Sequence, residues 1–126
     1  MIPIKDFNLR YTIESGQPLT FYSSYSKSGS EEALKYVTMT GAIEVKISGN
    51  SMSRTFSGDY SNRSADAEVK ERFGLSDDMQ DVYKKISTDQ FLSDAIKDFY
   101  GMRITRNDPW EATLCFVISQ FNNLKE

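Results

Sequence analysis

The sequence predicts an α+β fold, in which an antiparallel sheet of about five strands is followed by three or four helices. Up to residues 62–64, β-branched and aromatic residues alternate with polar ones, and glycine-containing turns separate the runs. Beyond that point, helix-capping residues and helical spacing of apolar residues take over. We therefore divide the chain into a sheet-forming part, residues 1–63, and a helical part, residues 64–126.

Five runs in the first part have the composition expected of strands. They cover residues 7–13, 19–25, 34–39, 43–47 and 52–56. In the first run the apolar positions that alternate with polar ones are Phe7, Leu9, Tyr11 and Ile13. Residues 15–18 are predicted to form a turn, and Gly49-Asn50 a hairpin. A sheet of this kind buries one face and needs other elements to cover it.

The second part supplies three helices that could provide this cover. The first is predicted over residues 65–73, with Ser64 as its N-cap and Gly74 directly after it. The next two begin at capping boxes, formed by Asp77 with Gln80 and by Ser87 with Gln90. Gly101 ends the third helix.

The last predicted helix has the strongest start signal in the chain. Asp108 is expected to be its N-cap and Pro109 its first residue, while Glu111 returns a hydrogen bond to the cap. The helix is apolar on most sides through Ile118, which is typical of a central helix. Because the sequence ends soon afterwards, we expect this helix to open a truncated helical domain.

The composition excludes several classes of active site. There is no histidine, which rules out Ser-His-Asp catalysis and histidine metal ligands. The single cysteine, Cys115, lies in an apolar run and is predicted to be a buried side chain. The Asp77–Asp78 pair falls at a helix start, where carboxylates favour the helix dipole, so we predict caps there and not an acid/base pair. No cofactor and no metal site is predicted.

The charge and hydropathy of the chain bear on its partners and its location. A net charge of −3 and a pI near 5.0 argue against an isolated DNA-binding module, since such modules are usually basic. No apolar run approaches the ~20 residues of a membrane span, and the N-terminus lacks the features of a signal peptide. We therefore expect an intracellular protein with no membrane partner.

Two stretches resemble a known family. The longer one runs from Glu68 to Lys125. Within it, residues 68–75 read EVKERFGL, residues 99–111 read FYGMRITRNDPWE, and an apolar helix and the run QFNN follow. This is similar to the start of the helix-hairpin-helix domain of 8-oxoguanine DNA glycosylases. Ser15-Gly16-Gln17 resembles the S-G-Q turn near the beginning of the same family. Residues 26–61 match only weakly. The resemblance implies that the sheet belongs to a TATA-binding-protein-like N-terminal domain.

The resemblance assigns damage recognition to Gly16 and Gln17. In the family, the backbone carbonyl of this glycine accepts a hydrogen bond from the N7-H of 8-oxoguanine. Normal guanine has an acceptor at N7 and cannot make that bond, so one carbonyl can discriminate the two bases. Glycine suits the position because the backbone must approach the base closely. Gln17 is expected to support the turn.

The resemblance assigns a second contact with DNA to the residues after the last helix. Phe121 falls at the position of the wedge that fills the gap left by the extruded base, and Asn122 and Asn123 follow it. The family commonly has asparagine where this chain has Phe121. An apolar wedge can unstack bases but offers no hydrogen bond to the opposite cytosine. Lys125 is a candidate phosphate contact.

The resemblance implies that the parent protein excises oxidised guanine from double-stranded DNA and cleaves the strand through a lysine Schiff base. The family's nucleophilic lysine and activating aspartate lie beyond the point where this sequence ends, so we predict no catalytic residue here. The isolated chain is therefore expected to be inactive and to self-associate through its last helix. Its expected location is cytoplasmic and nucleoid-associated, or nuclear in a eukaryote.

Two alternatives stay open at this stage. An alkylated-base glycosylase of the same superfamily would share the sheet and an apolar wedge, although the S-G-Q turn argues against it. A non-catalytic protein-binding module of sheet and helices is favoured by the acidic pI.

Overall fold

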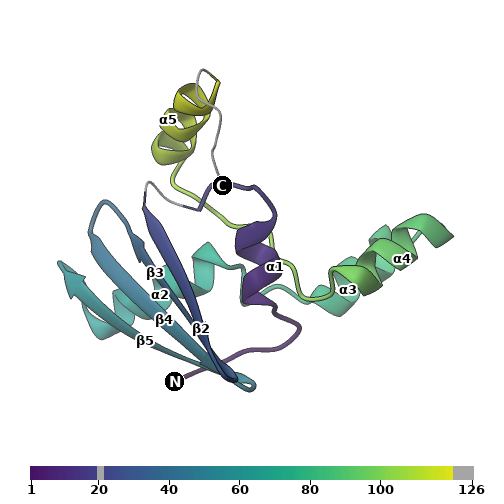
Figure 1. The fold of residues 1–126 in the computed structure, drawn as a ribbon, viewed down its shortest axis with the longest axis horizontal. Helices are drawn as coiled ribbons and strands as arrows, with labels where there is room; N and C mark the ends of the chain where they lie inside the picture. Colours follow the sequence, from purple (N-terminus) through teal and green to yellow (C-terminus); the bar gives the residue numbers. More distant parts are fainter. Residues whose placement is uncertain (20–21, 121–126) are drawn as a thin grey trace.

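The computed structural model describes residues 1–19 and 22–120, which form an antiparallel sheet and five helices (Figure 1). The strands are β1 (Ile2–Pro3), β2 (Ser23–Ser28), β3 (Glu31–Val37), β4 (Gly41–Ser48) and β5 (Ser51–Gly58). The helices are α1 (Leu9–Glu14), α2 (Asn62–Arg72), α3 (Met79–Ile86), α4 (Gln90–Asp98) and α5 (Pro109–Ser119). None of the helices in these two ranges is long and apolar enough to cross a bilayer.

The five strands lie in the order β1-β5-β4-β3-β2, and every neighbouring pair is antiparallel. Strands β2 to β5 form a meander. Ser48 pairs with Ser51, so Gly49-Asn50 forms the predicted two-residue hairpin loop between β4 and β5. The predicted α+β class with a five-stranded antiparallel sheet is confirmed.

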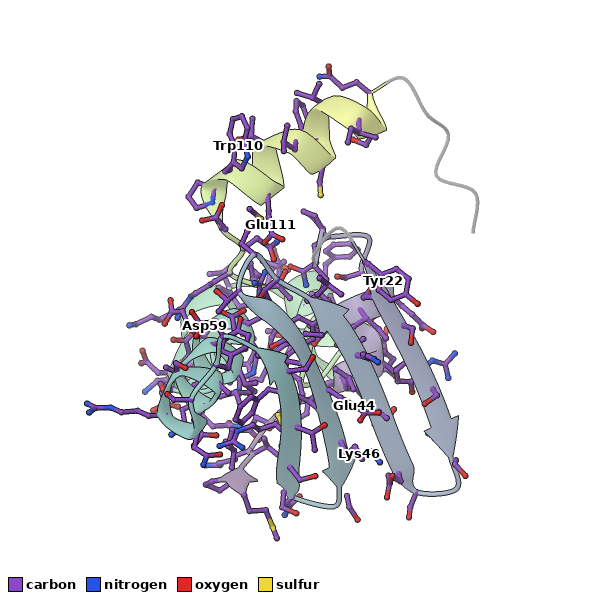
Figure 2. All side chains as sticks on the ribbon, turned by 90° about the vertical axis from the view of Figure 1, so that its left-hand side faces the viewer. Tyr22, Glu44, Lys46, Asp59, Trp110 and Glu111 are labelled. Carbon is purple, nitrogen blue, oxygen red and sulfur yellow. The ribbon has the colours of Figure 1, made fainter. Side chains whose placement is uncertain are left out.

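One face of the sheet is buried. In β4, Ile43, Val45 and Ile47 point into the core, as their alternation predicts, whereas Glu44 and Lys46 lie on the open face (Figure 2). Helix α2 and the N-terminal segment cover the buried face. The core cluster comprises Ile2, Leu9, Leu19, Leu34, Tyr36, Ile43, Val45, Ile47, Met52, Val69 and Phe73.

The strand predicted over residues 7–13 is wrong. The edge strand is β1, which pairs with β5 through Ile2 and Met52, and most of the predicted run is helix α1. Asn8 starts that helix, because its side chain accepts a hydrogen bond from the Tyr11 amide at 2.9 Å. Leu9 and Thr12 are the buried residues of the helix, and their separation by three positions is a helical spacing.

Helix α2 starts earlier than predicted. Its N-cap is Ser61 and not Ser64, and the two serines exchange backbone and side-chain hydrogen bonds as a capping box. Gly74 follows the C-terminal residues with a φ of 56°, as predicted for a residue that ends a helix in the left-handed conformation.

The next two helices are capped by neighbours of the predicted residues. Asp78 and not Asp77 caps α3, because the Asp77 carboxylate is 2.8 Å from the Arg106 guanidinium. Asp89 and not Ser87 caps α4, since the Ser87 hydroxyl hydrogen-bonds that of Ser93. At α4 the acidic cap is favoured over serine because a carboxylate also interacts favourably with the helix dipole.

Helices α3 and α4 form an arm on one side of the sheet, while α5 extends from another side (Figure 1). Asp108 caps α5 as predicted, accepting hydrogen bonds from the amides of Trp110 and Glu111. Much of the apolar surface of α5 is open, with Trp110 62% exposed and Phe116 63% exposed. Its buried residue is Glu111. In the described structure α5 is therefore not surrounded by other elements.

Candidate functional site

The turn after α1 presents Gly16 at the surface. Ser15 closes the helix by donating its hydroxyl to the Thr12 carbonyl at 2.8 Å. Gly16 then adopts a φ of 78°, which side chains disfavour. A Cβ placed there would meet no atom within 4 Å. The glycine is thus required by the backbone conformation and not by crowding, and the space beside it is open to a ligand.

The side-chain amide of Gln17 fixes this turn through hydrogen bonds. Its Nε2 donates to the carbonyls of Thr12 at 3.2 Å and Arg103 at 2.6 Å. Its Oε1 accepts from the Thr105 amide at 2.9 Å and the Thr105 hydroxyl at 3.2 Å. Both ends of the amide are therefore occupied, so Gln17 anchors the turn and has little capacity left for a ligand.

The residue after Gln17 is held by the same segment of the chain. The Pro18 carbonyl accepts hydrogen bonds from the Thr105 hydroxyl at 3.1 Å and from the Asn107 amide. The Arg103 amide donates to the Thr12 hydroxyl at 3.1 Å. The turn at residues 15–18 is thus fixed on residues 103–107, which lie between α4 and α5.

Arg103 belongs to this segment, and it is only 3% exposed. Its guanidinium donates to three backbone carbonyls, those of Gly74 at 2.8 Å, Lys5 at 2.8 Å and Asp6 at 3.2 Å. Burial lowers the pKa of Arg103, but a guanidinium titrates so far above neutral pH that it stays charged. Arg103 therefore ties the N-terminal segment to the end of α2. The sequence analysis gave this arginine no role, although it lies inside the GMRITRNDPWE stretch.

A second buried arginine, Arg72, meets Glu111 next to the turn. Arg72 is 4% exposed and Glu111 2% exposed, and 3.7 Å separates the Arg72 Nη1 from the Glu111 Oε2. The Glu111 Oε1 has no hydrogen-bond partner in the described part of the chain. The prediction that Glu111 returns a hydrogen bond to the Asp108 cap is therefore wrong, because its side chain turns inward to the arginine.

Burial gives Glu111 a measurable pH signature. It raises the pKa of the Glu111 carboxyl above its ordinary value, and Arg72 offsets only part of this effect. A raised pKa in the folded state contributes stability that is present at low pH and is lost as pH rises through that pKa. The side chain introduced by Glu111→Gln stays neutral. The difference in unfolding free energy between this variant and wild type is therefore expected to move in favour of the variant as pH rises from about 4 to about 7.

Urea unfolding across that range measures this difference. Glu31→Gln, at an exposed position of β3, is the control, and its unfolding free energy relative to wild type is expected to show no such increase with pH. A Glu111→Gln difference from wild type that stays constant with pH would contradict the assignment.

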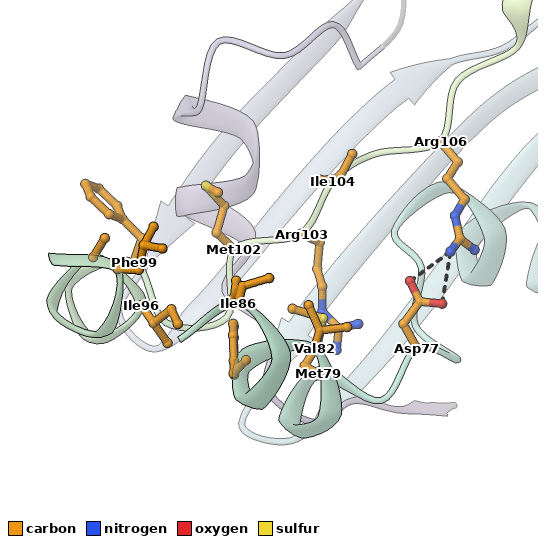
Figure 3. Close-up of a pocket in the computed structure, with 13 residues that line it drawn as sticks. Asp77, Met79, Val82, Ile86, Ile96, Phe99, Met102, Arg103, Ile104 and Arg106 are labelled. Carbon is orange, nitrogen blue, oxygen red and sulfur yellow. Dashed lines mark hydrogen bonds and ion pairs between the residues drawn. The ribbon is translucent and has the colours of Figure 1, made fainter. Parts of the chain in front are cut away.

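An apolar groove of ≈ 530 Å³ lies between α3, α4 and residues 102–106 (Figure 3). Met79, Val82 and Ile86 of α3 face it together with Ile96 of α4 and Phe99, the residue after that helix. The Asp77–Arg106 ion pair lies at its edge. Within residues 1–19 and 22–120, no group of three or more histidine, cysteine or acidic side chains is placed to bind a metal.

The predicted site residues divide into two groups. Gly16 and Gln17 lie together in the turn, which the Pro18–Asn107 hydrogen bond places next to the start of α5. Phe121, Asn122, Asn123 and Lys125 lie outside the described residues. The polar contacts through Arg72, Arg103 and Thr105 were not predicted. The sequence signal for them was their position within the family-like stretch from Glu68 to Lys125.

Comparison with known proteins identifies the family. The family model for the N-terminal domain of 8-oxoguanine DNA glycosylase matches residues 1–113. Among solved structures, that of MBOgg1 in complex with a low affinity DNA ligand is similar, with a TM-score of 0.73 and 28% identity, over 95% of this chain and 39% of that one. No curated protein sequence matches.

Two structures of the 8-oxoguanine glycosylase/lyase of Clostridium acetobutylicum share the fold at 22% identity. The apo-form has a TM-score of 0.70, over 97% of this chain and 43% of that one. The complex with double-stranded DNA containing cytosine opposite 8-oxoG has a TM-score of 0.69, over 97% and 42%. This chain thus spans about two fifths of the length of these structures. Since the family model covers most of the sequence, the chain belongs to the family of 8-oxoguanine DNA glycosylase N-terminal domains.

Proposed function

We propose that this chain is the damage-recognition portion of an 8-oxoguanine DNA glycosylase/lyase that acts in base-excision repair, in the cytoplasm or the nucleus. The observation that carries the proposal is the turn at Gly16. Its backbone is exposed and unobstructed, and Gln17 holds it through four hydrogen bonds. A carbonyl in a rigid turn can be aimed at a base without losing conformational entropy on binding.

The discrimination rests on one hydrogen atom. Oxidation of guanine gives N7 a proton, so a carbonyl placed opposite N7 gains a hydrogen bond with 8-oxoguanine and meets a lone pair with guanine. The choice of base follows one similar structure, which holds double-stranded DNA containing cytosine opposite 8-oxoG. The substrate proposed for the whole enzyme is therefore an oxidised guanine that is flipped out of duplex DNA.

We assign recognition and not bond cleavage to this chain. From the resemblance we expect the family's lysine and aspartate to have no counterpart among these residues, and the chain spans about two fifths of the similar structures. The isolated chain is expected to release no base and cut no strand in a duplex that contains 8-oxoguanine. Turnover above the protein-free control would contradict this assignment.

Fluorescence anisotropy with matched duplexes tests the proposal. The chain is expected to bind a duplex with an 8-oxoguanine–cytosine pair about tenfold more tightly than the guanine–cytosine duplex, which is the worth of one hydrogen bond of ordinary strength. A duplex with an alkylated base is the third arm. Equal affinity for the oxidised and normal duplexes, or a preference for the alkylated one, would overturn the proposal.

A pair of glycine variants locates the effect in the turn. Gly16 and Gly29 both have left-handed backbones, with φ of 78° and 60°, and both have open space where a Cβ would lie. Alanine at either position should therefore cost a similar ~1 kcal/mol of stability. We expect Gly16→Ala to lose the preference for 8-oxoguanine, whereas Gly29→Ala, in the β2–β3 hairpin, keeps it. Equal behaviour of the two variants in binding would exclude a special role for Gly16.

The exposed apolar side chains of α5 support self-association of the isolated chain. Trp110, Phe116, Val117 and Ile118 are each at least 49% exposed. Contiguous apolar surface of this kind favours burial against another molecule. Light scattering is expected to show a concentration-dependent dimer or larger species, and a monomer at all concentrations would contradict this part of the proposal.

A further inference from the structure

Arg72 connects the turn at Gly16 to the start of α5. It is the last residue of α2, and its side chain is buried at the point where three segments of the chain meet. Its Nη1 donates to the Leu19 carbonyl at 2.9 Å and to the Asn107 Oδ1 at 2.8 Å. The same nitrogen lies 3.7 Å from the Glu111 carboxylate in the first turn of α5.

The rest of the guanidinium is fixed by its own helix and by the sheet. Nε and Nη2 contact the Glu68 carboxylate at 2.8 and 2.7 Å. The guanidinium carbon lies 5.7 Å from the centre of the Tyr36 ring, which packs in the core. A planar group with its donors in a rigid fork cannot move toward one partner without leaving the others.

The backbone of Arg72 strengthens the same junction. Its carbonyl accepts a hydrogen bond from the Arg106 amide at 2.8 Å. Asn107, which Arg72 holds through its side chain, donates in turn to the Pro18 carbonyl. Residues 105–107 are therefore held between the turn on one side and Arg72 on the other.

We propose that Arg72 is a positioning residue for damage recognition, because it fixes the Gly16 turn and the first turn of α5 in one frame. This inference rests on the proposed function, in which the turn at Gly16 meets the damaged base. Through Leu19, Asn107 and Glu111, a change in the direction of α5 reaches the turn. Arg72 thus sets how the Gly16 turn and the start of α5 lie relative to each other.

Stability alone does not explain a buried arginine–glutamate pair here. Removing two charges from water costs about as much free energy as their attraction returns, and apolar side chains of similar volume often replace such pairs without loss. The charged pair adds direction, because the hydrogen bonds of the Arg72 guanidinium to Glu68, Leu19 and Asn107 are all made in this one arrangement. An apolar pair at the same positions would fill the volume and leave the orientation free.

The double variant Arg72→Met/Glu111→Leu separates the two roles. The chain is expected to remain folded with a lowered thermal midpoint, because the Leu19 carbonyl and the Asn107 Oδ1 lose their donor while the apolar pair still fills the volume. Amide hydrogen exchange at Thr105 and Arg106, which report the two sides of the junction, is expected to accelerate about tenfold or more, while that of Val45 in the sheet is unchanged. The preference for the 8-oxoguanine duplex is expected to fall at least severalfold, with unchanged affinity for the guanine duplex.

A second variant covers the case in which the double variant does not fold. Asn107→Ala removes the link between Arg72 and Pro18 at a half-buried position and keeps the ion pair. It is expected to accelerate amide exchange at Thr105 and Arg106 and to weaken the preference for the 8-oxoguanine duplex, each by a smaller factor than the double variant does. If the variant that folds exchanges the Thr105 amide at the wild-type rate and keeps the full preference for the 8-oxoguanine duplex, the inference is overturned. If wild type shows no preference for 8-oxoguanine, the proposed function fails, yet the exchange rates still decide whether Arg72 couples the two segments.

Discussion

Arg103→Met is expected to lower the unfolding free energy of the chain by about 3 kcal/mol, because it strands buried hydrogen-bond acceptors and not because it opens a cavity. The carbonyls of Lys5, Asp6 and Gly74 all lose their charged donor. Methionine fills most of the space but donates nothing, so the free energy of desolvating these carbonyls is no longer offset. Urea unfolding followed by circular dichroism measures the change.

Arg63→Met is the matched control for this prediction. Arg63 is exposed on α2, so the same chemical change should alter the unfolding free energy by less than about 0.5 kcal/mol. If both variants unfolded at the same urea concentration as wild type, Arg103 would not hold the N-terminal segment against α2, and this account of the junction would fail.

Gln17→Glu is expected to cost about 2–4 kcal/mol although it changes only one atom type and the charge. The introduced oxygen takes the place of an Nε2 that donates to the carbonyls of Thr12 and Arg103. Three acceptors then face one another with no proton between them. We expect the turn to open and the preference for 8-oxoguanine to disappear, as measured by urea unfolding and by anisotropy.

The pH dependence of this variant gives an internal check. The introduced carboxyl can donate a hydrogen bond only when it is protonated, so its pKa in the folded state lies above that in the unfolded state. The variant therefore regains stability as pH falls and loses it as pH rises. Gln90→Glu, at an exposed position of α4, places a carboxylate beside that of Asp94 and should cost less than about 0.5 kcal/mol. A Gln17→Glu variant as stable as wild type at neutral pH would refute the role of Gln17 as an anchor.

The sheet was predictable because side-chain alternation is strong evidence where one face is buried. Ile43, Val45 and Ile47 have no other arrangement that buries all three. The same evidence failed for residues 7–13, where apolar residues also occur at every second position. There the local capping bond from Asn8 and the burial of Leu9 and Thr12 favour a helix. Alternation over one short run does not distinguish the two structures.

The buried charges could not be predicted from the sequence. Arg72, Arg103 and Glu111 are charged residues in stretches that the sequence predicts to be solvated helix ends or loops. Charged side chains are rarely buried. Each is buried because partners distant in sequence, such as Lys5 and Leu19, satisfy it. Local patterns carry no information on such contacts. The resemblance located Gly16 and Gln17, but only the structure shows that the Gln17 amide is fully engaged.

The most direct test of the central claim is to follow the backbone amides of the isotopically labelled chain by NMR during titration with DNA. With a duplex that contains 8-oxoguanine opposite cytosine, the amide signals of Gly16 and Gln17 are expected to shift early and strongly, whereas the guanine duplex is expected to leave them nearly unchanged. Shifts confined to the open face of the sheet around Glu44 and Lys46, or equal shifts with both duplexes, would contradict the claim that the turn at Gly16 recognises oxidised guanine.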